Sequence, residues 1–120
     1  MKKKILIIED DPLIIKILVF ILKKEGYETF VATEGTDGID QIGKLNPDLI
    51  ITDIMMPYKS GLEITSFSKK NYPKIPLIIV SSLGTEDHTV IEGFKLGADD
   101  FIAKPFNPIE LTLRVKRFLL

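Results

Sequence analysis

Five short apolar runs recur along the chain, and they limit its possible folds more than any other feature of the sequence. Three of the runs are uninterrupted and aliphatic, as expected of parallel strands covered on both faces, and each interval is long enough for a crossover helix. In chain order the runs are Ile5–Ile8, Phe30–Ala32, Leu49–Ile51, Leu77–Val80 and Phe101–Ala103. We therefore predict an α/β fold made of five βα units.

The intervals between these runs carry helical signals of different strength. The first helix has Asp11 as a cap, Pro12 in its first turn and Gly26 at its end. The last follows Asn107-Pro108, carries apolar residues at helical spacing and is expected to run to the end of the chain. Weaker patterns predict helices over residues 36–45, 61–70 and 86–96, with proline and glycine breakers between them.

Length and composition narrow the class of protein. A chain of 120 residues has enough material for one hydrophobic core and too little for two, so we predict a single domain over residues 1–120. The net charge of -1 leaves no global basic field for nucleic acid or an anionic membrane. The absence of cysteine excludes disulfides, thiolate catalysis and sulfur-ligated metals. Because Glu9 interrupts the first apolar run, we expect no signal peptide and a cytoplasmic location.

Polar side chains directly follow four of the predicted strands. In an open α/β sheet the ligand crevice lies outside the carboxyl ends of the strands, so these residues are candidates for one common site. After the first, third, fourth and fifth strands, respectively, they are Glu9-Asp10-Asp11, Asp53, Ser81-Ser82 and Lys104-Pro105.

The acids of this group predict a metal site. Consecutive carboxylates at the end of a buried strand repel one another, and Asp53 would add a further negative charge that needs a counter-ion. Mg²⁺ takes octahedral oxygen coordination and often binds through one or two carboxylates, water and a phosphate oxygen. Asp11 by itself is better explained as the helix cap.

The other members of the group each allow two interpretations. Asp53 is either a nucleophile toward phosphorus beside the metal or a metal ligand with no chemistry. Lys104 is either a surface lysine or, through a cis peptide bond to Pro105, a cation aimed at phosphoryl charge. Ser81 either terminates its strand or gives its hydroxyl to the same phosphoryl group.

Taken together and in this order, the motifs resemble the receiver domain of two-component response regulators, the CheY-like family. The resemblance spans the whole chain. It implies a doubly wound (βα)5, flavodoxin-like three-layer sandwich whose parallel sheet has the strand order 2-1-3-4-5. The motifs are Ile7-Ile-Glu-Asp-Asp-Pro12, Asp53-Ile-Met-Met-Pro57, Val80-Ser-Ser82 and Gly97-Ala-Asp-Asp-Phe-Ile-Ala-Lys-Pro-Phe106.

The resemblance also implies roles for seven residues. They divide into a phosphoacceptor, ligands of Mg²⁺, a phosphoryl-binding cation and a pair of switch residues. Asp53 would accept the phosphoryl group and contact Mg²⁺, Asp10 would bind the ion directly, Glu9 through water, and Met55 through its backbone carbonyl; Lys104 would bind the phosphoryl group, and Ser81 and Phe101 would be the coupled switch residues.

Partners and output follow from the same resemblance. The phosphodonor would be a phosphohistidine of a sensor histidine kinase or histidine phosphotransfer protein, and the chain would catalyse only its own phosphorylation and dephosphorylation. Residues 99–114 look most like the receivers of winged-helix transcription regulators, which form homodimers through the fourth helix, fifth strand and fifth helix. Asp99, Asp100, Glu110, Arg114 and Lys116 are candidates for crossed ion pairs, although Val90 replaces the usual basic partner of Glu110. Ordinary surface charges explain them equally well.

Three rival functions compete with a phosphoacceptor. A haloacid-dehalogenase-type phosphatase would need a second acid two residues after Asp53, where this chain has Met55. A flavodoxin would need a phosphate-binding loop where Glu9-Asp10-Asp11 would repel phosphate. The remaining alternative is a phosphorylation-independent interaction module on the same fold, which leaves the retention of the candidate site residues unexplained.

Overall fold

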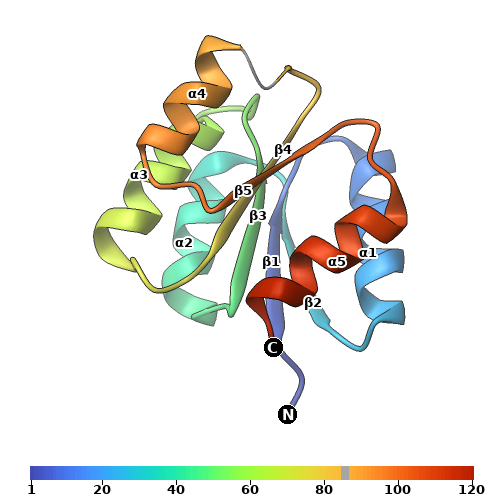
Figure 1. The fold of residues 1–120 in the computed structure, drawn as a ribbon. Helices are drawn as coiled ribbons and strands as arrows, with labels where there is room; N and C mark the ends of the chain where they lie inside the picture. The colour runs from blue at the N-terminus through green and yellow to red at the C-terminus, as the bar shows by residue number, and fades with distance from the viewer. Residues whose placement is uncertain (85–86) are drawn as a thin grey trace.

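The computed structural model describes residues 1–84 and 87–120 and places a parallel sheet between two layers of helices (Figure 1). The strands and helices alternate along the chain, which confirms the predicted α/β, flavodoxin-like fold of five βα units. The strands are β1 (Lys4–Ile8), β2 (Glu28–Ala32), β3 (Leu49–Asp53), β4 (Leu77–Ser81) and β5 (Asp100–Ala103); the helices are α1 (Pro12–Lys24), α2 (Gly35–Leu45), α3 (Gly61–Asn71), α4 (His88–Lys95) and α5 (Pro108–Phe118).

The strand order is β2-β1-β3-β4-β5, as predicted, and every neighbouring pair is parallel. This order puts β3 in the centre of the sheet, between β1 and β4. The register pairs Ile8 of β1 with Thr52 of β3, and Asp53 with Val80 of β4. The carboxyl ends of β1, β3 and β4 therefore lie side by side at one edge of the sheet.

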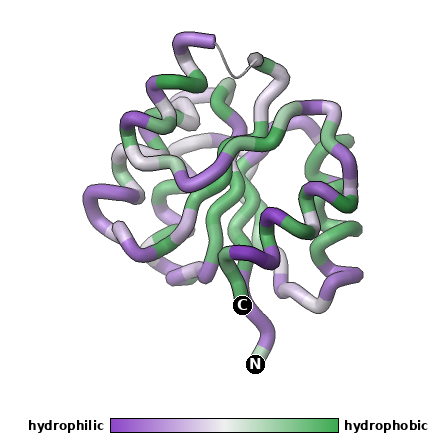
Figure 2. The backbone as a smooth tube through the Cα atoms, viewed as in Figure 1, coloured by the Kyte–Doolittle hydropathy of each residue, from purple (hydrophilic) through white to green (hydrophobic). Residues whose placement is uncertain are grey.

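Alternate residues of the central strands face opposite helical layers. Leu6 and Ile8 pack in the cluster on the α2–α3–α4 side, whereas Ile5 and Ile7 pack in the cluster beneath α1 and α5. The coloured tube shows this burial as hydrophobic strands inside and hydrophilic segments on the outer turns of the helices (Figure 2). Because both faces are covered, the strands are continuous apolar runs without the polar alternation of a one-sided sheet.

Element boundaries differ from the sequence predictions by a few residues. β2 and β5 begin at the polar residues Glu28 and Asp100, because strand pairing extends past the apolar runs. α2 begins at Gly35, where the Glu34 side chain accepts from the Asp37 N–H and caps the helix. α5 ends at Phe118, two residues before the predicted end. The predicted helix start at Glu86 lies outside the described residues, and α4 is described from His88.

Two local predictions are confirmed. The Asp11 carboxylate accepts hydrogen bonds from the Leu13 and Ile14 amides and caps α1. The peptide bond between Lys104 and Pro105 is cis.

Over residues 1–84 and 87–120, no helix has the length and apolar character needed to cross a bilayer.

Candidate acidic site at the carboxyl ends of the strands

Asp53 is the last residue of the central strand and is almost fully buried, with 8% of its surface exposed. One carboxylate oxygen, Oδ1, accepts a hydrogen bond from the Ile54 amide at 2.7 Å. The other, Oδ2, lies 3.0 Å from the ammonium nitrogen of Lys104. The backbone therefore orients one oxygen of Asp53, and a cation faces the other.

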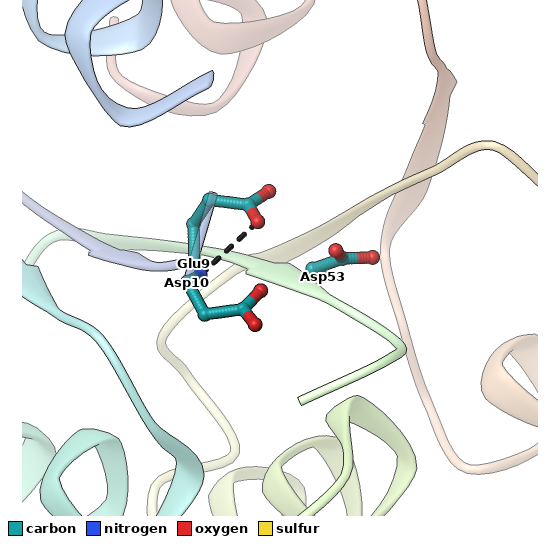
Figure 3. A group of neighbouring side chains, drawn as sticks. All are labelled: Glu9, Asp10 and Asp53. Carbon is teal, nitrogen blue, oxygen red and sulfur yellow. Dashed lines mark hydrogen bonds between the residues drawn. The ribbon is translucent and has the colours of Figure 1, made fainter. Parts of the chain in front are cut away.

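Glu9 and Asp10 follow β1, the strand next to β3. Glu9 Oε2 accepts hydrogen bonds from the Asp10 and Asp11 amides, both at 3.1 Å, and Oε1 lies 2.8 Å from Lys104 Nζ. Glu9 is 2% exposed, whereas Asp10 is exposed. Figure 3 shows the side chains of Glu9 and Asp10 extending from the end of β1 beside that of Asp53.

The electrostatics of this cluster favour an additional cation. Burial raises the pKa of Glu9 above its usual range, with a further contribution from the negative charge of Asp53, and the hydrogen bond from Lys104 offsets only part of this shift. Burial would lower the pKa of Lys104, but its hydrogen bonds to Glu9 and Asp53 outweigh that effect and raise it. Three carboxylates and one ammonium leave a formal charge of -2 at the site, from three negative charges and one positive.

The donor set fits Mg²⁺. Glu9, Asp10 and Asp53 each offer a carboxylate oxygen, and these oxygens all lie within 4.8 Å of one another. In the described part of the chain, no hydrogen bond engages the Asp10 carboxylate, whereas both Glu9 oxygens already accept bonds. This difference suits direct coordination by Asp10 and coordination through water by Glu9. Oxygen ligands of this kind are those that a hard divalent cation prefers.

The three remaining candidates lie on β4, on β5 and in the loop after β3. Ser81 ends β4, is buried, and accepts a hydrogen bond through Oγ from the Leu83 amide at 3.2 Å. The Lys104 amide donates to the Ser81 carbonyl at 2.8 Å, so the ends of β4 and β5 are joined at this point. Met55 lies in the loop after Asp53, with its side chain exposed, and Phe101 is buried in the core.

A family model for the response regulator receiver domain matches residues 5–116, which is most of the chain. The chain belongs to the response regulator receiver family. Its carboxyl-edge acids and Lys104 therefore lie on the fold of a two-component signalling domain, as the sequence motifs indicated.

Solved structures of other receivers agree with this assignment. The chain is 31% identical to a CheY-like response regulator receiver domain protein from Methanospirillum hungatei, with a TM-score of 0.92 and coverage of 98% of this chain and 93% of that chain. The receiver domain of a Francisella response regulator is 34% identical, with a TM-score of 0.88 and coverage of 98% and 96%. The signal receiver domain of a signal transduction histidine kinase from Syntrophus aciditrophicus is 34% identical, with a TM-score of 0.89 and coverage of 98% and 89%.

The charged residues near the C-terminus of the receiver pair within the chain. Asp99 accepts from Lys69 Nζ at 2.6 Å, and Asp100 accepts from Arg114 and Arg117. Lys116 Nζ lies 3.0 Å from Glu25 of the α1 C-terminus, and Glu110 lies 3.8 Å from Arg114.

Sequence reasoning missed Lys69 and Arg117 as members of these pairs. The available signal for Arg117 was its spacing of three residues from Arg114, which puts both side chains on one helical face. No comparable signal linked Lys69 to Asp99, because α3 and the start of β5 meet only in the folded receiver.

Proposed function

We propose that this receiver takes a phosphoryl group onto Asp53, with Mg²⁺ as the cofactor, and thereby acts as a phosphorylation-controlled switch. The observation that carries this proposal is the Lys104 ammonium, which lies 3.0 Å from Asp53 and 2.8 Å from Glu9 within a cluster that fits a divalent cation. An attacking carboxylate, a metal site and a phosphoryl-binding cation are the groups that this reaction requires.

In the proposed reaction an oxygen of Asp53 attacks phosphorus in line with the bond to the donor. For a phosphohistidine donor the P–N bond breaks as the P–O bond forms, and the imidazole leaves with the electron pair and takes up a proton. The Ile54 amide holds the Asp53 carboxylate in place, and Lys104 donates hydrogen bonds to the phosphoryl oxygens. Bound Mg²⁺ would neutralise charge on the transferring group; Asp10, Asp53 and the Met55 carbonyl would hold it, with Glu9 acting through water.

The switch would act through Ser81 and Phe101. In this receiver the Ser81 hydroxyl oxygen accepts from the Leu83 amide, and we expect Ser81 to leave that bond and donate to a phosphoryl oxygen. Phe101 would be the aromatic that turns inward when Ser81 moves away from it. Its side chain is already buried here, with 7% exposed, while Ser81 still bonds to Leu83. A charge-changing modification that biases two packings is a common switching device.

The output surface would be the face formed by α4, β5 and α5. Ile91 and Phe94 of α4 are exposed apolar side chains that support a contact there. The proposal includes a homodimer through this face on phosphorylation, as in the winged-helix regulators that residues 99–114 resemble. Crossed ion pairs would have to replace pairs that Asp99, Asp100 and Lys116 already make within the chain. Sedimentation with beryllofluoride tests the dimer, and a monomer at high concentration excludes it.

The proposed partners are a sensor histidine kinase or a histidine phosphotransfer protein, in the cytoplasm, without direct binding of nucleic acid by this domain. The receiver would be a signalling switch and not an enzyme with a separate substrate, because its own Asp53 both attacks the donor and becomes phosphorylated.

Acetyl phosphate with Mg²⁺ tests the phosphoacceptor without a partner protein. Mass spectrometry should show the gain of one phosphoryl group on the wild type and none on Asp53→Asn, while Lys104→Ala should slow the gain. No gain on the wild type, or an equal gain on Asp53→Asn, would favour the phosphorylation-independent interaction module.

A further inference from the structure

The loop over residues 54–60, between β3 and α3, is held to the rest of the receiver at two places. At its base the Gly61 amide donates to the Ile54 carbonyl at 2.8 Å. At its tip the Pro57 carbonyl accepts from the Gly35 amide at 3.1 Å and from the Lys59 amide at 2.9 Å. Gly35 is the first residue of α2, so the loop that follows Asp53 rests on the start of a different βα unit.

This contact leaves no space for a side chain at Gly35. A Cβ atom at this position would overlap the Lys59 carbonyl oxygen and would lie 2.6 Å from the Lys59 carbonyl carbon and 2.5 Å from its Cβ. Two of these three atoms belong to the backbone, so rotation of the Lys59 side chain would not relieve the overlap. The backbone of the loop would have to move.

The tip of the loop also contains a strained residue. Tyr58 has a φ of 68°, in the left-handed region that is uncommon for an aromatic residue, and its side chain is 84% exposed. Such a conformation is energetically unfavourable and persists only where the surrounding structure holds it. The residues on both sides of Tyr58 are the ones that contact Gly35, so the Gly35 contact stabilises this backbone path.

A shift of the tip must be absorbed close to the acidic site. The two ends of the loop are packed tightly against each other. A Cβ at Gly61, after the loop, would overlap the Asp53 carbonyl oxygen and lie 2.7 Å from Ile54 Cα. Displacement of Pro57 and Lys59 would therefore pass into residues 55–56. Met55 is the loop residue whose carbonyl is proposed to bind Mg²⁺.

We propose that Gly35 is a positioning residue for the Mg²⁺ site: its missing side chain lets the loop dock on α2 and so fixes the Met55 carbonyl. This inference rests on the proposed function for its link to phosphoryl transfer. The contact of Gly35 with the loop, and the effect of Gly35 on Mg²⁺ affinity, can each be measured without that reaction. Groups that orient metal ligands from outside the coordination shell typically change metal affinity by about 10- to 100-fold.

The test compares Gly35→Ala with Gly43→Ala, a matched change in the same helix. Among the residues that the structure describes, the Tyr72 hydroxyl oxygen is the one atom within 4 Å of a Cβ at Gly43, at 3.2 Å. We expect Gly35→Ala to speed hydrogen–deuterium exchange of residues 54–60 and trypsin cleavage after Lys59 in the metal-free chain. We also expect it to weaken Mg²⁺ binding, measured by calorimetric titration, by about tenfold or more. Gly43→Ala should leave these three measurements at their wild-type values.

A second control separates positioning from a general loss of stability. Val115→Ala opens a cavity under α5, on the other side of the sheet from α2. If Val115→Ala weakens Mg²⁺ binding as much as Gly35→Ala does, or if Gly35→Ala leaves loop exchange or Mg²⁺ affinity unchanged, the proposal is wrong.

The wild-type chain supplies a measurement that needs no variant to fold. Mg²⁺ should slow exchange of the Gly35 amide proton, which bonds to the loop, and an unchanged rate would count against the coupling. Failure of the phosphoacceptor proposal would be recognised differently, as Mg²⁺ binding and loop protection without any phosphoryl gain from acetyl phosphate.

Discussion

Glu9 is a buried carboxylate beside two other acids, and this placement makes the metal-free site electrostatically unfavourable. Burial raises its pKa, repulsion from Asp53 adds to the shift, and Lys104 compensates only in part. A group whose folded-state pKa is raised stabilises the fold at pH values below its unfolded-state pKa and loses that contribution as the pH rises through the folded-state pKa. Ionised Glu9 should therefore weaken the metal-free receiver at neutral pH.

Replacement of this carboxylate by an amide should expose the effect. With EDTA present, we expect Glu9→Gln to unfold at a higher temperature than the wild type at pH 7, because it removes a buried charge. The difference should shrink as the pH falls through the range above the usual Glu pKa, where Glu9 of the wild type takes up a proton. Thermal unfolding across pH measures this, with the exposed Glu28→Gln as control. If the difference in unfolding temperature between Glu9→Gln and the wild type stays constant with pH, the ionisation of Glu9 is not its cause.

The members of the acidic site could be predicted from the sequence, but their contacts could not. Glu9 and Lys104 directly follow apolar runs and Asp53 follows one after Thr52, so their position at one edge of a parallel sheet required only the strand assignments. The position of Lys104 Nζ between Glu9 and Asp53 depends on the rotamers of side chains 51 and 95 residues apart in sequence. Local pattern holds no information on such a contact.

At the scale of the elements, Asp100 ties β5 to α5. Asp100 is 8% exposed, and its carboxylate accepts from Arg114 at 2.8 and 2.9 Å and from Arg117 at 3.1 Å. The Phe101 amide donates to the same carboxylate at 2.8 Å. The strand predicted from the sequence began after Asp100, because charged residues are rarely buried in strands. In the folded receiver, arginines of α5 neutralise Asp100 and allow it to begin β5.

Loss of one arginine should therefore destabilise the receiver. We expect Arg114→Ala to lower the free energy of unfolding by about 1–3 kcal/mol, because the largely buried Asp100 carboxylate loses the nitrogen that bonds to both of its oxygens and retains Arg117 as a charged partner. Glu110→Ala removes the exposed contact to the same arginine and should change the free energy by about 0–1 kcal/mol. Urea unfolding of both variants provides the comparison. Equal losses of unfolding free energy would show that the Arg114–Asp100 ion pair does not stabilise the fold.

Across the whole molecule, the net charge of -1 does not show where the basic residues lie relative to the acidic site. The helices run antiparallel to the strands, so their C-termini lie at the edge of the sheet opposite the acidic site. Each helix has a basic residue in its last turn, where it also interacts favourably with the helix dipole. These residues are Lys23 and Lys24, Lys44, Lys69 and Lys70, Lys95, and Lys116 and Arg117. The acids at the other edge therefore have little compensation from these lysines and arginines at long range.

Mg²⁺ should consequently stabilise the entire fold. The acids come from the ends of β1 and β3 and their cation from the end of β5, so the site exists only when the sheet is complete. A ligand that binds only the folded state adds about 1.4 kcal/mol at a tenfold excess over its Kd. For a chain of this length that corresponds to a rise of about 5 °C in the unfolding midpoint. Calorimetry in MgCl₂, against KCl of equal ionic strength, measures this rise.

Variants of two neighbouring acids, Asp10 and Asp11, distinguish Mg²⁺ binding at the site from general screening of negative charge. Asp10→Asn removes the exposed carboxylate of the cluster and should abolish most of the rise, whereas Asp11→Asn retains a residue that caps α1 well and should keep it. Screening alone would reduce the rise to a similar extent in both variants, since each loses one negative charge at nearly the same place. A rise that is undiminished in Asp10→Asn would mean that the ion binds elsewhere on the receiver.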